Sequence, residues 1–243
     1  MRRASDYLNH LSKLGHLREL SHPGRPRQPK RAMRSRPLTP GRSNNSFGVL
    51  ILAAGLSTRL GQPKARIRYR GVELLSHTLA RAAALDPQWI GVVVNRALRA
   101  VIPPAAGVDR IINPAPEQGM GLSLALGVAK APKRLGALLI VTVDQWALTR
   151  MDLKRLCRGG GQCRVAAYDN TLGIPALFPR RWFKQLQRLG GEQGAKRLIM
   201  QATSQQLPSP VIRVALPHAG YDLDTARDLH SLRAYQRRPT RSR

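Results

Sequence analysis

The apolar stretch FGVLILAA covers residues 47–54 and runs directly into Gly55. An uninterrupted apolar run of this length is typical of a strand that is buried on both faces of a parallel sheet. Two later runs, WIGVVVN (89–95) and LGALLIVTV (135–143), have the same character. The sequence therefore predicts a buried sheet with these three strands at its centre.

Shorter segments complete the alternation of strands and helices. The helix at residues 149–157 has the clearest start, because Thr149 and Asp152 resemble a capping box. This alternation predicts an α/β fold with a mainly parallel central sheet, helices on both faces, and ligands at the carboxyl ends of the strands. The further expected elements are strands at 109–113, 163–168 and 211–216, and helices at 73–84, 121–130, 179–189, 194–202 and 224–235.

Positive charge is concentrated at the two ends of the chain. The 243 residues include 41 Lys+Arg and 13 Asp+Glu, for a net charge of +28. Residues 1–47 hold eleven basic and two acidic side chains, and the last seven residues hold four arginines. The Pro-, Arg- and Ser-rich composition of residues 21–46 cannot offset the entropy of ordering. We expect a basic, disordered extension at 1–46, one folded domain at 47–236 and a basic tail at 237–243.

The role of the extension stays open between three readings: a targeting arm, a nucleic-acid tail, and a start codon assigned too early, with Met33 as the true start. Other features exclude whole classes of protein. The sequence contains no run of about eighteen apolar residues, so it predicts no membrane-spanning helix. Two cysteines, Cys157 and Cys163, cannot form a disulfide framework or a four-ligand zinc site. A cytoplasmic location is therefore expected.

Small residues and two cations follow the first predicted strand, in AAGLSTRLGQPK (53–64). Glycine and alanine allow close approach of a ligand, and exposed backbone N–H groups there form an anion cradle. Arg59 and Lys64 add two positive charges, so a triphosphate satisfies both features. A P-loop is excluded because Lys64 stands between Pro63 and Ala65. The alternative is a glycine turn with solvated basic side chains.

A second loop, NPAPEQGMGLSL (113–124), places Ser123 in the first turn of a predicted helix. Unpaired N–H groups and the positive end of the helix dipole favour anions there. Glycine turns before helices are common, so this loop taken alone is a weak indication of a site.

Carboxylates complete the predicted site. Asp144 follows the strand at 135–143 directly, and Asp222 and Asp224 share one face of the extended segment YDLDT (221–225). Carboxylate oxygens are the hard ligands that Mg²⁺ prefers. Asp224 is also suited to cap the last helix, and the two roles are compatible. Together with the basic cradle, the acids predict a nucleotide–Mg²⁺ site.

Six blocks in order resemble the MobA-like nucleotidyltransferases, and most closely their molybdenum cofactor cytidylyltransferase branch. The resemblance covers about residues 48–232. The blocks are LAAGLSTRLGQPK (52–64), NPAPEQGMGLSLALG (113–127), VDQ (143–145), GIPALF (173–178), GGEQGAKRLI (190–199) and YDLDTARDL (221–229).

This resemblance implies a Rossmann-like nucleotidyltransferase fold of the nucleotide-diphospho-sugar transferase type. It also implies Mg²⁺-dependent transfer of a nucleoside monophosphate from an NTP to a phosphorylated acceptor, with release of pyrophosphate. The Ala53–Ala54 pair favours CTP, because guanylyl relatives have paired glycines there. By position, the catalytic residues are Arg59, Lys64 and Asp144, and the metal ligands are Asp144 and Asp224. The nucleotide-binding residues are Leu52, Ala53, Ala54, Gly55, Ser57, Arg59, Lys64, Asn113, Gly119, Ser123 and Asp144.

The expected acceptor is molybdopterin, and a molybdoenzyme or a chaperone is an expected further partner. Two departures from the family pattern affect the site: Trp146 replaces the usual proline after the aspartate, and Ile174 replaces a frequent histidine. Because the nucleotide-binding loop does not define the acceptor, a sugar phosphate or polyol phosphate acceptor stays an alternative. A basic nucleic-acid-associated protein is the alternative from another class, but no RRM, KH or zinc-finger pattern is found.

Overall fold

The computed structural model of the chain describes residues 46–101, 107–159, 161–191, 194–204 and 211–236. The predicted basic tail, and the predicted extension except for Ser46, lie outside the described residues. In the described part, no helix is long and apolar enough to cross a membrane.

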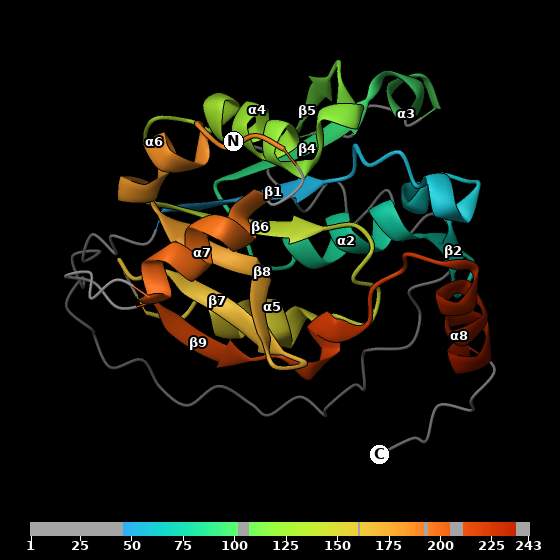
Figure 1. The fold of residues 1–243 in the computed structure, drawn as a ribbon. Coiled ribbons are helices and arrows are strands. Elements are labelled where there is room, and N and C mark those ends of the chain that lie inside the picture. The colour runs from blue at the N-terminus through green and yellow to red at the C-terminus, as the bar shows by residue number, and fades with distance from the viewer. Residues whose placement is uncertain (1–45, 102–106, 160, 192–193, 205–210, 237–243) are drawn as a thin grey trace, which may run out of the picture.

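A seven-stranded sheet forms the centre of the described structure, with the strand order β5-β4-β1-β6-β8-β7-β9 (Figure 1). Only β8 runs opposite to its neighbours, and the other pairings within the sheet are parallel. The mainly parallel sheet is therefore confirmed, with the three predicted central strands side by side as β4, β1 and β6. The strand bounds are β1 Phe47–Leu52, β4 Trp89–Asn95, β5 Val108–Asn113, β6 Ala137–Thr142, β7 Arg164–Tyr168, β8 Thr171–Pro179 and β9 Ile212–Ala215.

Strand β8 was not predicted, and the helix expected at 179–189 is confirmed only in part. Pro179 ends β8, and only a 3₁₀ turn, η4 (Arg180–Trp182), and a four-residue helix, α6 (Phe183–Leu186), follow it. A two-residue turn at Asp169 and Asn170, both with positive φ, joins β7 to β8. Positive φ at both turn residues matches the twist of a tight hairpin. Residues 171–179 form a strand because they pair with β6 and β7, and the apolar pattern of the segment alone does not reveal these pairings.

Helices cover both faces of the sheet (Figure 1). Alternation along β1 separates the two cores: Val49 and Ile51 pack with one cluster, and Leu50 and Leu52 with the other. One face carries α4 (Met120–Lys130), α6 and α7 (Gly194–Ser204), and the other carries α2 (Leu74–Ala83), α3 (Arg96–Val101), α5 (Arg150–Leu156) and α8 (Ala226–Gln236). Each fully buried Leu or Ile contributes about 1.5–3 kcal/mol. Helix α3 and a small hairpin, β2 (Arg68–Tyr69) with β3 (Val72–Glu73), were not predicted.

Two capping boxes mark the starts of helices α5 and α8, which cover the same face of the sheet. The predicted box at α5 is confirmed, because Thr149 Oγ1 accepts from the Asp152 N–H and the Asp152 carboxylate accepts from the Thr149 N–H. At α8, however, Thr225 and not Asp224 is the cap. Thr225 Oγ1 accepts from the Asp228 N–H at 3.3 Å, and Asp228 Oδ2 accepts from the Thr225 N–H at 2.7 Å. The capping role proposed for Asp224 is therefore wrong, and its carboxylate is available for another role.

The start of α4 lies directly against the loop at residues 190–191. The Gly121 N–H donates to the Gly191 carbonyl at 2.9 Å. A Cβ atom at Gly121 would lie 2.5 Å from the carbonyl carbon of Gly190, so a larger residue cannot fit without moving that backbone. This contact explains the glycine at position 121 in the second of the quoted blocks.

Candidate functional site

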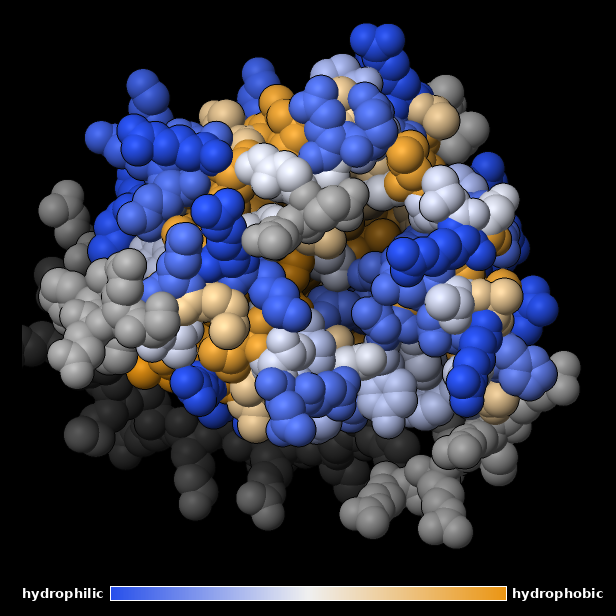
Figure 2. Space-filling model, in the orientation of Figure 1, coloured by the Kyte–Doolittle hydropathy of each residue, from blue (hydrophilic) through white to orange (hydrophobic). Residues whose placement is uncertain are grey.

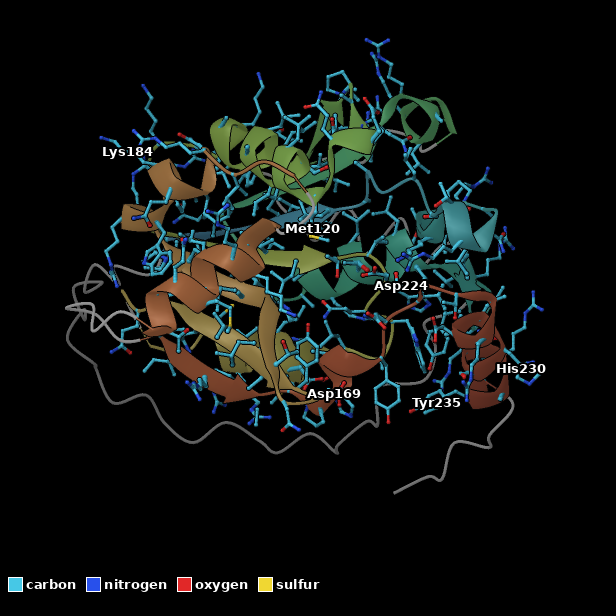
Figure 3. All side chains as sticks on the ribbon, in the orientation of Figure 1. Met120, Asp169, Lys184, Asp224, His230 and Tyr235 are labelled. Carbon is cyan, nitrogen blue, oxygen red and sulfur yellow. The ribbon has the colours of Figure 1, made fainter. Side chains whose placement is uncertain are left out.

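A cavity of about 530 Å³ opens where β1 and β6 end. This is the edge of the sheet at which open α/β folds bind ligands. Figure 2 shows the hollow near the centre of this face, with apolar residues at its floor. Met120 and Asp224, which come from opposite faces of the sheet, both lie near the centre of the same view (Figure 3).

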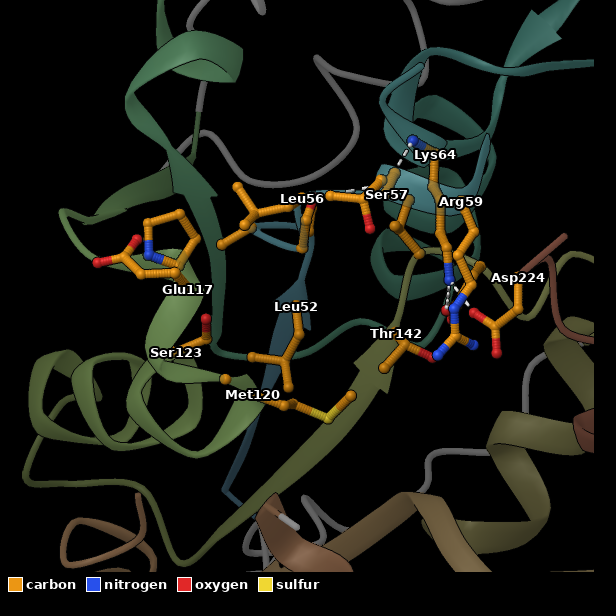
Figure 4. A pocket seen from close by; sticks show the side chains of 18 residues that line it. Leu52, Leu56, Ser57, Arg59, Lys64, Glu117, Met120, Ser123, Thr142 and Asp224 are labelled. Carbon is orange, nitrogen blue, oxygen red and sulfur yellow. Dashed lines mark hydrogen bonds and ion pairs between the residues drawn. The ribbon is translucent and has the colours of Figure 1, made fainter. Parts of the chain in front are cut away.

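Eleven of the twelve predicted site residues line this cavity. They are Leu52, Ala53, Ala54, Gly55, Ser57, Arg59, Lys64, Gly119, Ser123, Asp144 and Asp224. In Figure 4, Ser57, Arg59, Lys64 and Asp224 lie toward one end of the cavity, and Glu117, Met120 and Ser123 lie toward the other. Segments that are far apart in the sequence are thus brought to one place, as the ordered blocks predicted.

The turn after β1 is closed by one side chain. Ser57 has a left-handed conformation (φ 54°), and its hydroxyl accepts a hydrogen bond from the Lys64 N–H at 3.2 Å. In the described part of the chain, no acceptor is found for the N–H groups of Gly55, Leu56 and Ser57. All three residues line the cavity, and backbone N–H groups without a protein acceptor can bind phosphate oxygens. The donors that the expected anion cradle needs are therefore present in this turn.

Lys64 lies between two carboxylates. Its Nζ is 2.9 Å from Asp144 Oδ2 and also pairs with Asp224 Oδ1. Burial favours the neutral amine, but the charges and hydrogen bonds of Asp144 and Asp224 outweigh burial and raise the pKa of Lys64. The ammonium therefore stays charged at neutral pH and connects the loop after β6 with the segment before α8.

A third carboxylate is close to this pair. The pKa of Asp222 is raised, first by burial and then by the negative charges of Asp224 and Asp144. Three acids around one ammonium leave excess negative charge, which a divalent cation would neutralise. Among the described residues, no group of three or more ligating side chains is placed to hold a metal ion. Asp144 and Asp224 nevertheless fit Mg²⁺, because that ion is usually held by one or two carboxylates together with substrate phosphates and water.

Asn113 is the one predicted site residue that does not line the cavity. It is fully buried, and its Nδ2 donates to Ser123 Oγ at 2.9 Å. Its Oδ1 accepts from the Ala115 N–H at 2.9 Å, which shapes the loop before α4. Asn113 therefore holds Ser123 and this loop in place from behind.

Several lining residues were not singled out by the sequence. They are Leu56, Thr58, Pro116, Glu117, Met120, Thr142 and Val143. All seven fall within or directly beside the quoted blocks, but only the fold shows which members of a block face the cavity. Leu56 and Met120 are 50% and 40% exposed, so the cavity has apolar wall residues as well as charged ones.

Comparisons with known proteins agree with this geometry. Residues 49–207 match the family described as MobA-like NTP transferase domain. The bifunctional protein GlmU of Stutzerimonas stutzeri (strain A1501) is 32% identical over 140 residues, which are 56% of this chain and 30% of GlmU. The chain thus spans less than a third of that relative's length.

Solved structures show the same fold. Rv0371c of Mycobacterium tuberculosis H37Rv is similar with a TM-score of 0.67 and 28% identity, over 77% of this chain and 97% of Rv0371c. A structure of Rv0371c in complex with manganese has a TM-score of 0.63, 26% identity and the same coverage. The molybdopterin-guanine dinucleotide biosynthesis protein A of Archaeoglobus fulgidus, at 14% identity, shares the fold, with a TM-score of 0.55 over 77% of this chain and 97% of its own. The family match, the fold and the cavity lead to one conclusion: the chain belongs to the MobA-like NTP transferase domain family and is a nucleotidyltransferase.

Proposed function

We propose that this enzyme transfers a nucleoside monophosphate from an NTP, with CTP favoured, to a phosphorylated acceptor, with molybdopterin favoured, and that it requires Mg²⁺. One observation carries the proposal: Lys64, Asp144 and Asp224 meet at one end of the cavity that also contains the turn after β1. Cations and backbone N–H groups suit a triphosphate, and paired carboxylates suit its metal.

The reaction needs no nucleophile from the protein. An oxygen of the acceptor phosphate forms a bond to the α-phosphorus, and the bond from that phosphorus to the oxygen bridging to the β-phosphate breaks. Pyrophosphate leaves with the electron pair. Catalysis then consists of alignment of the two substrates and stabilisation of negative charge. Arg59 and Lys64 line the cavity where they can neutralise the leaving pyrophosphate.

Asp144 and Asp224 would hold the Mg²⁺, which supplies charge neutralisation and a template for the phosphate oxygens. The related Rv0371c has been crystallised with manganese, which supports a divalent cation in this family. Asp144 acts as a ligand in this proposal and not as a general base, because the attacking phosphate oxygen is already ionised at neutral pH.

The donor and acceptor preferences rest on fewer residues. Ala53 and Ala54 both line the cavity, which supports a role of this pair in the choice of base. The acceptor alternatives, a sugar phosphate or a polyol phosphate, share the same ionised oxygen and differ only in the group behind it. A molybdoenzyme or a chaperone as a further partner, and action in the cytoplasm, stay predictions.

Pyrophosphate release tests the proposal directly. The full chain is incubated with Mg²⁺ and each of the four NTPs, together with molybdenum cofactor, a sugar phosphate, a polyol phosphate or no acceptor. We expect release with CTP and molybdenum cofactor, and none after removal of Mg²⁺ with a chelator. Release with another acceptor alone would replace the proposed acceptor, and no release in any combination would overturn the proposal. Binding of RNA without binding of any NTP would favour the nucleic-acid alternative.

A further inference from the structure

Gln145 is a buried amide that joins three separate segments. The residue directly follows Asp144 in the sequence and is only 5% exposed. Its Nε2 donates to the carbonyl of Ile174 in β8 and to the carbonyl of Ala219 in η5 (Pro217–Gly220), both at 2.9 Å. Its Oε1 accepts from Thr142 Oγ1 at 3.0 Å. Both N–H donors and the carbonyl oxygen of the amide are therefore used.

These bonds connect the two acidic segments of the site. Gln145 shares the loop of Asp144, and Ala219 lies five residues before Asp224 on the segment that leads into α8. The side chain of Lys64 also bridges Asp144 and Asp224, but it is expected to contact phosphate when a nucleotide binds. Gln145 is not among the residues that line the cavity, so its bonds can persist with substrate present.

Other contacts hold the Asp144 loop from the side of α2. Arg81 donates to the Trp146 carbonyl at 2.8 Å and to the Gln145 carbonyl at 3.4 Å. The Trp146 ring also packs against Tyr221, with 5.8 Å between ring centroids. These contacts fix the backbone of the loop at residues 144–146. The side-chain amide of Gln145 then joins this loop to the segment at residues 217–224 through the Ala219 carbonyl.

We propose that Gln145 is a positioning residue that sets the separation of Asp144 and Asp224 and so tunes the affinity for the divalent cation. The inference rests on the metal site of the proposed function. Two carboxylates repel each other, and the two amide hydrogen bonds oppose separation of the segments that carry them. Only an amide fits this role, since a carboxylate of the same shape would present oxygen to the Ile174 and Ala219 carbonyls.

Two variants and one control test this role in the full chain. Gln145→Glu keeps the shape but loses both donors, and Gln145→Met removes all three side-chain hydrogen bonds without adding charge. Thr78→Val is the control, because it removes a buried hydroxyl whose hydrogen bond, to the Leu74 carbonyl, stays within α2. The measurements are binding of Mn²⁺ by electron paramagnetic resonance and hydrogen exchange of peptides that cover residues 216–225.

We expect both Gln145 variants to bind Mn²⁺ about tenfold more weakly, within the range known for groups that orient metal ligands. Exchange in residues 216–225 should be faster in both variants and unchanged in Thr78→Val. If Gln145→Glu fails to fold, Gln145→Met decides the question. Unchanged exchange in Gln145→Met overturns the inference whether or not metal binds, and faster exchange with unchanged Mn²⁺ affinity also overturns it. A wild-type chain that binds no Mn²⁺ overturns the metal site itself, and this inference with it.

Discussion

The ammonium of Lys64 lies 2.9 Å from the carboxylate of Asp144 and pairs at the same time with Asp224. The side chains of Lys64 and Asp144 are only 17% and 19% exposed, so solvent screens this contact incompletely. Lys64 thus lies between the two carboxylates that we propose as metal ligands. Entry of a divalent cation should release its ammonium toward the phosphates of the nucleotide.

A Lys64→Met variant should therefore bind Mn²⁺ more tightly in the absence of nucleotide. A unit charge about 4 Å away at a partly buried site interacts by about 4 kcal/mol, and about 1.4 kcal/mol is a factor of ten, so loss of the competing ammonium should tighten binding by about tenfold to a thousandfold. Turnover should nevertheless fall by about 10²- to 10³-fold, because a group that stabilises transition-state charge is lost. Titration with Mn²⁺ and initial rates measure the two effects. Arg66→Met, which removes a cation paired with Glu73 nearby, is the control. Weaker Mn²⁺ binding in Lys64→Met would contradict the exchange of cations.

Asp144→Asn should fold normally and lose most turnover, because an amide oxygen is a poorer ligand for Mg²⁺ than a carboxylate. Circular dichroism checks the fold, and pyrophosphate release at limiting Mg²⁺ checks activity. Asp86→Asn removes the same charge from an exposed turn with positive φ, where asparagine is tolerated. It should leave activity unchanged. Equal rates for wild type and Asp144→Asn at limiting Mg²⁺ would reject the ligand role.

Gly121→Ala should destabilise the protein by about 1–3 kcal/mol, as is typical when extra volume is forced into a packed site. The new methyl group would lie 2.5 Å from the Gly190 backbone, so the loop at residues 190–191 would have to move. Gly190→Ala is a matched control across the same contact, because its Cβ would meet nothing within 4 Å. Urea unfolding of both variants measures the difference. Equal stability of the two variants would show that the contact does not restrict residue 121.

The carboxylate of Asp152 should make stability depend on pH in the acid range. Burial works to raise the pKa of Asp152, but hydrogen bonds from Thr149 and His218 outweigh burial and lower it. A folded-state pKa below the unfolded value of about 3.9 stabilises the protein fully above that value, and the contribution is lost as the pH falls through the folded-state pKa. Asp152→Asn should therefore cost about 1 kcal/mol at pH 7 and less at pH 3. Urea unfolding at both pH values tests this, and a cost independent of pH would contradict it.

The two thiols should be unreactive in the folded protein. Burial raises the pKa of Cys157 to about 11 and that of Cys163 to about 12, so thiolate is scarce at pH 8. Alkylation with iodoacetamide at pH 8 should be slow in buffer and fast in urea, with mass spectrometry as the readout. Fast labelling of Cys163, which is fully buried, would show that its surroundings open readily.

Much of the fold and the site could be predicted from local sequence. The three central strands are continuous apolar runs, so their burial on both faces follows from composition alone. The capping box at Thr149 and Asp152 depends on residues three apart and was equally visible. Segments that follow buried strands meet at one edge of a parallel sheet, which predicts that Arg59, Lys64 and Asp144 lie at one edge. The complete set of twelve site residues was implied by the family resemblance, and eleven of them line one cavity.

What the tertiary structure alone decided involves partners that are distant in the chain. Strand β8 exists because β6 and β7 lie on either side of it, and no local pattern reports neighbours of that kind. Thr225 and Asp224 are both good helix caps, and the local box with Asp228 makes Thr225 the cap. The pairing of Asp224 with Lys64, 160 positions away, is what only the fold shows. Gln145 reaches carbonyls that are 29 and 74 residues away. A sequence records which groups can donate and accept, but burial and distance, which set the strength of these interactions, are established only when the chain has folded.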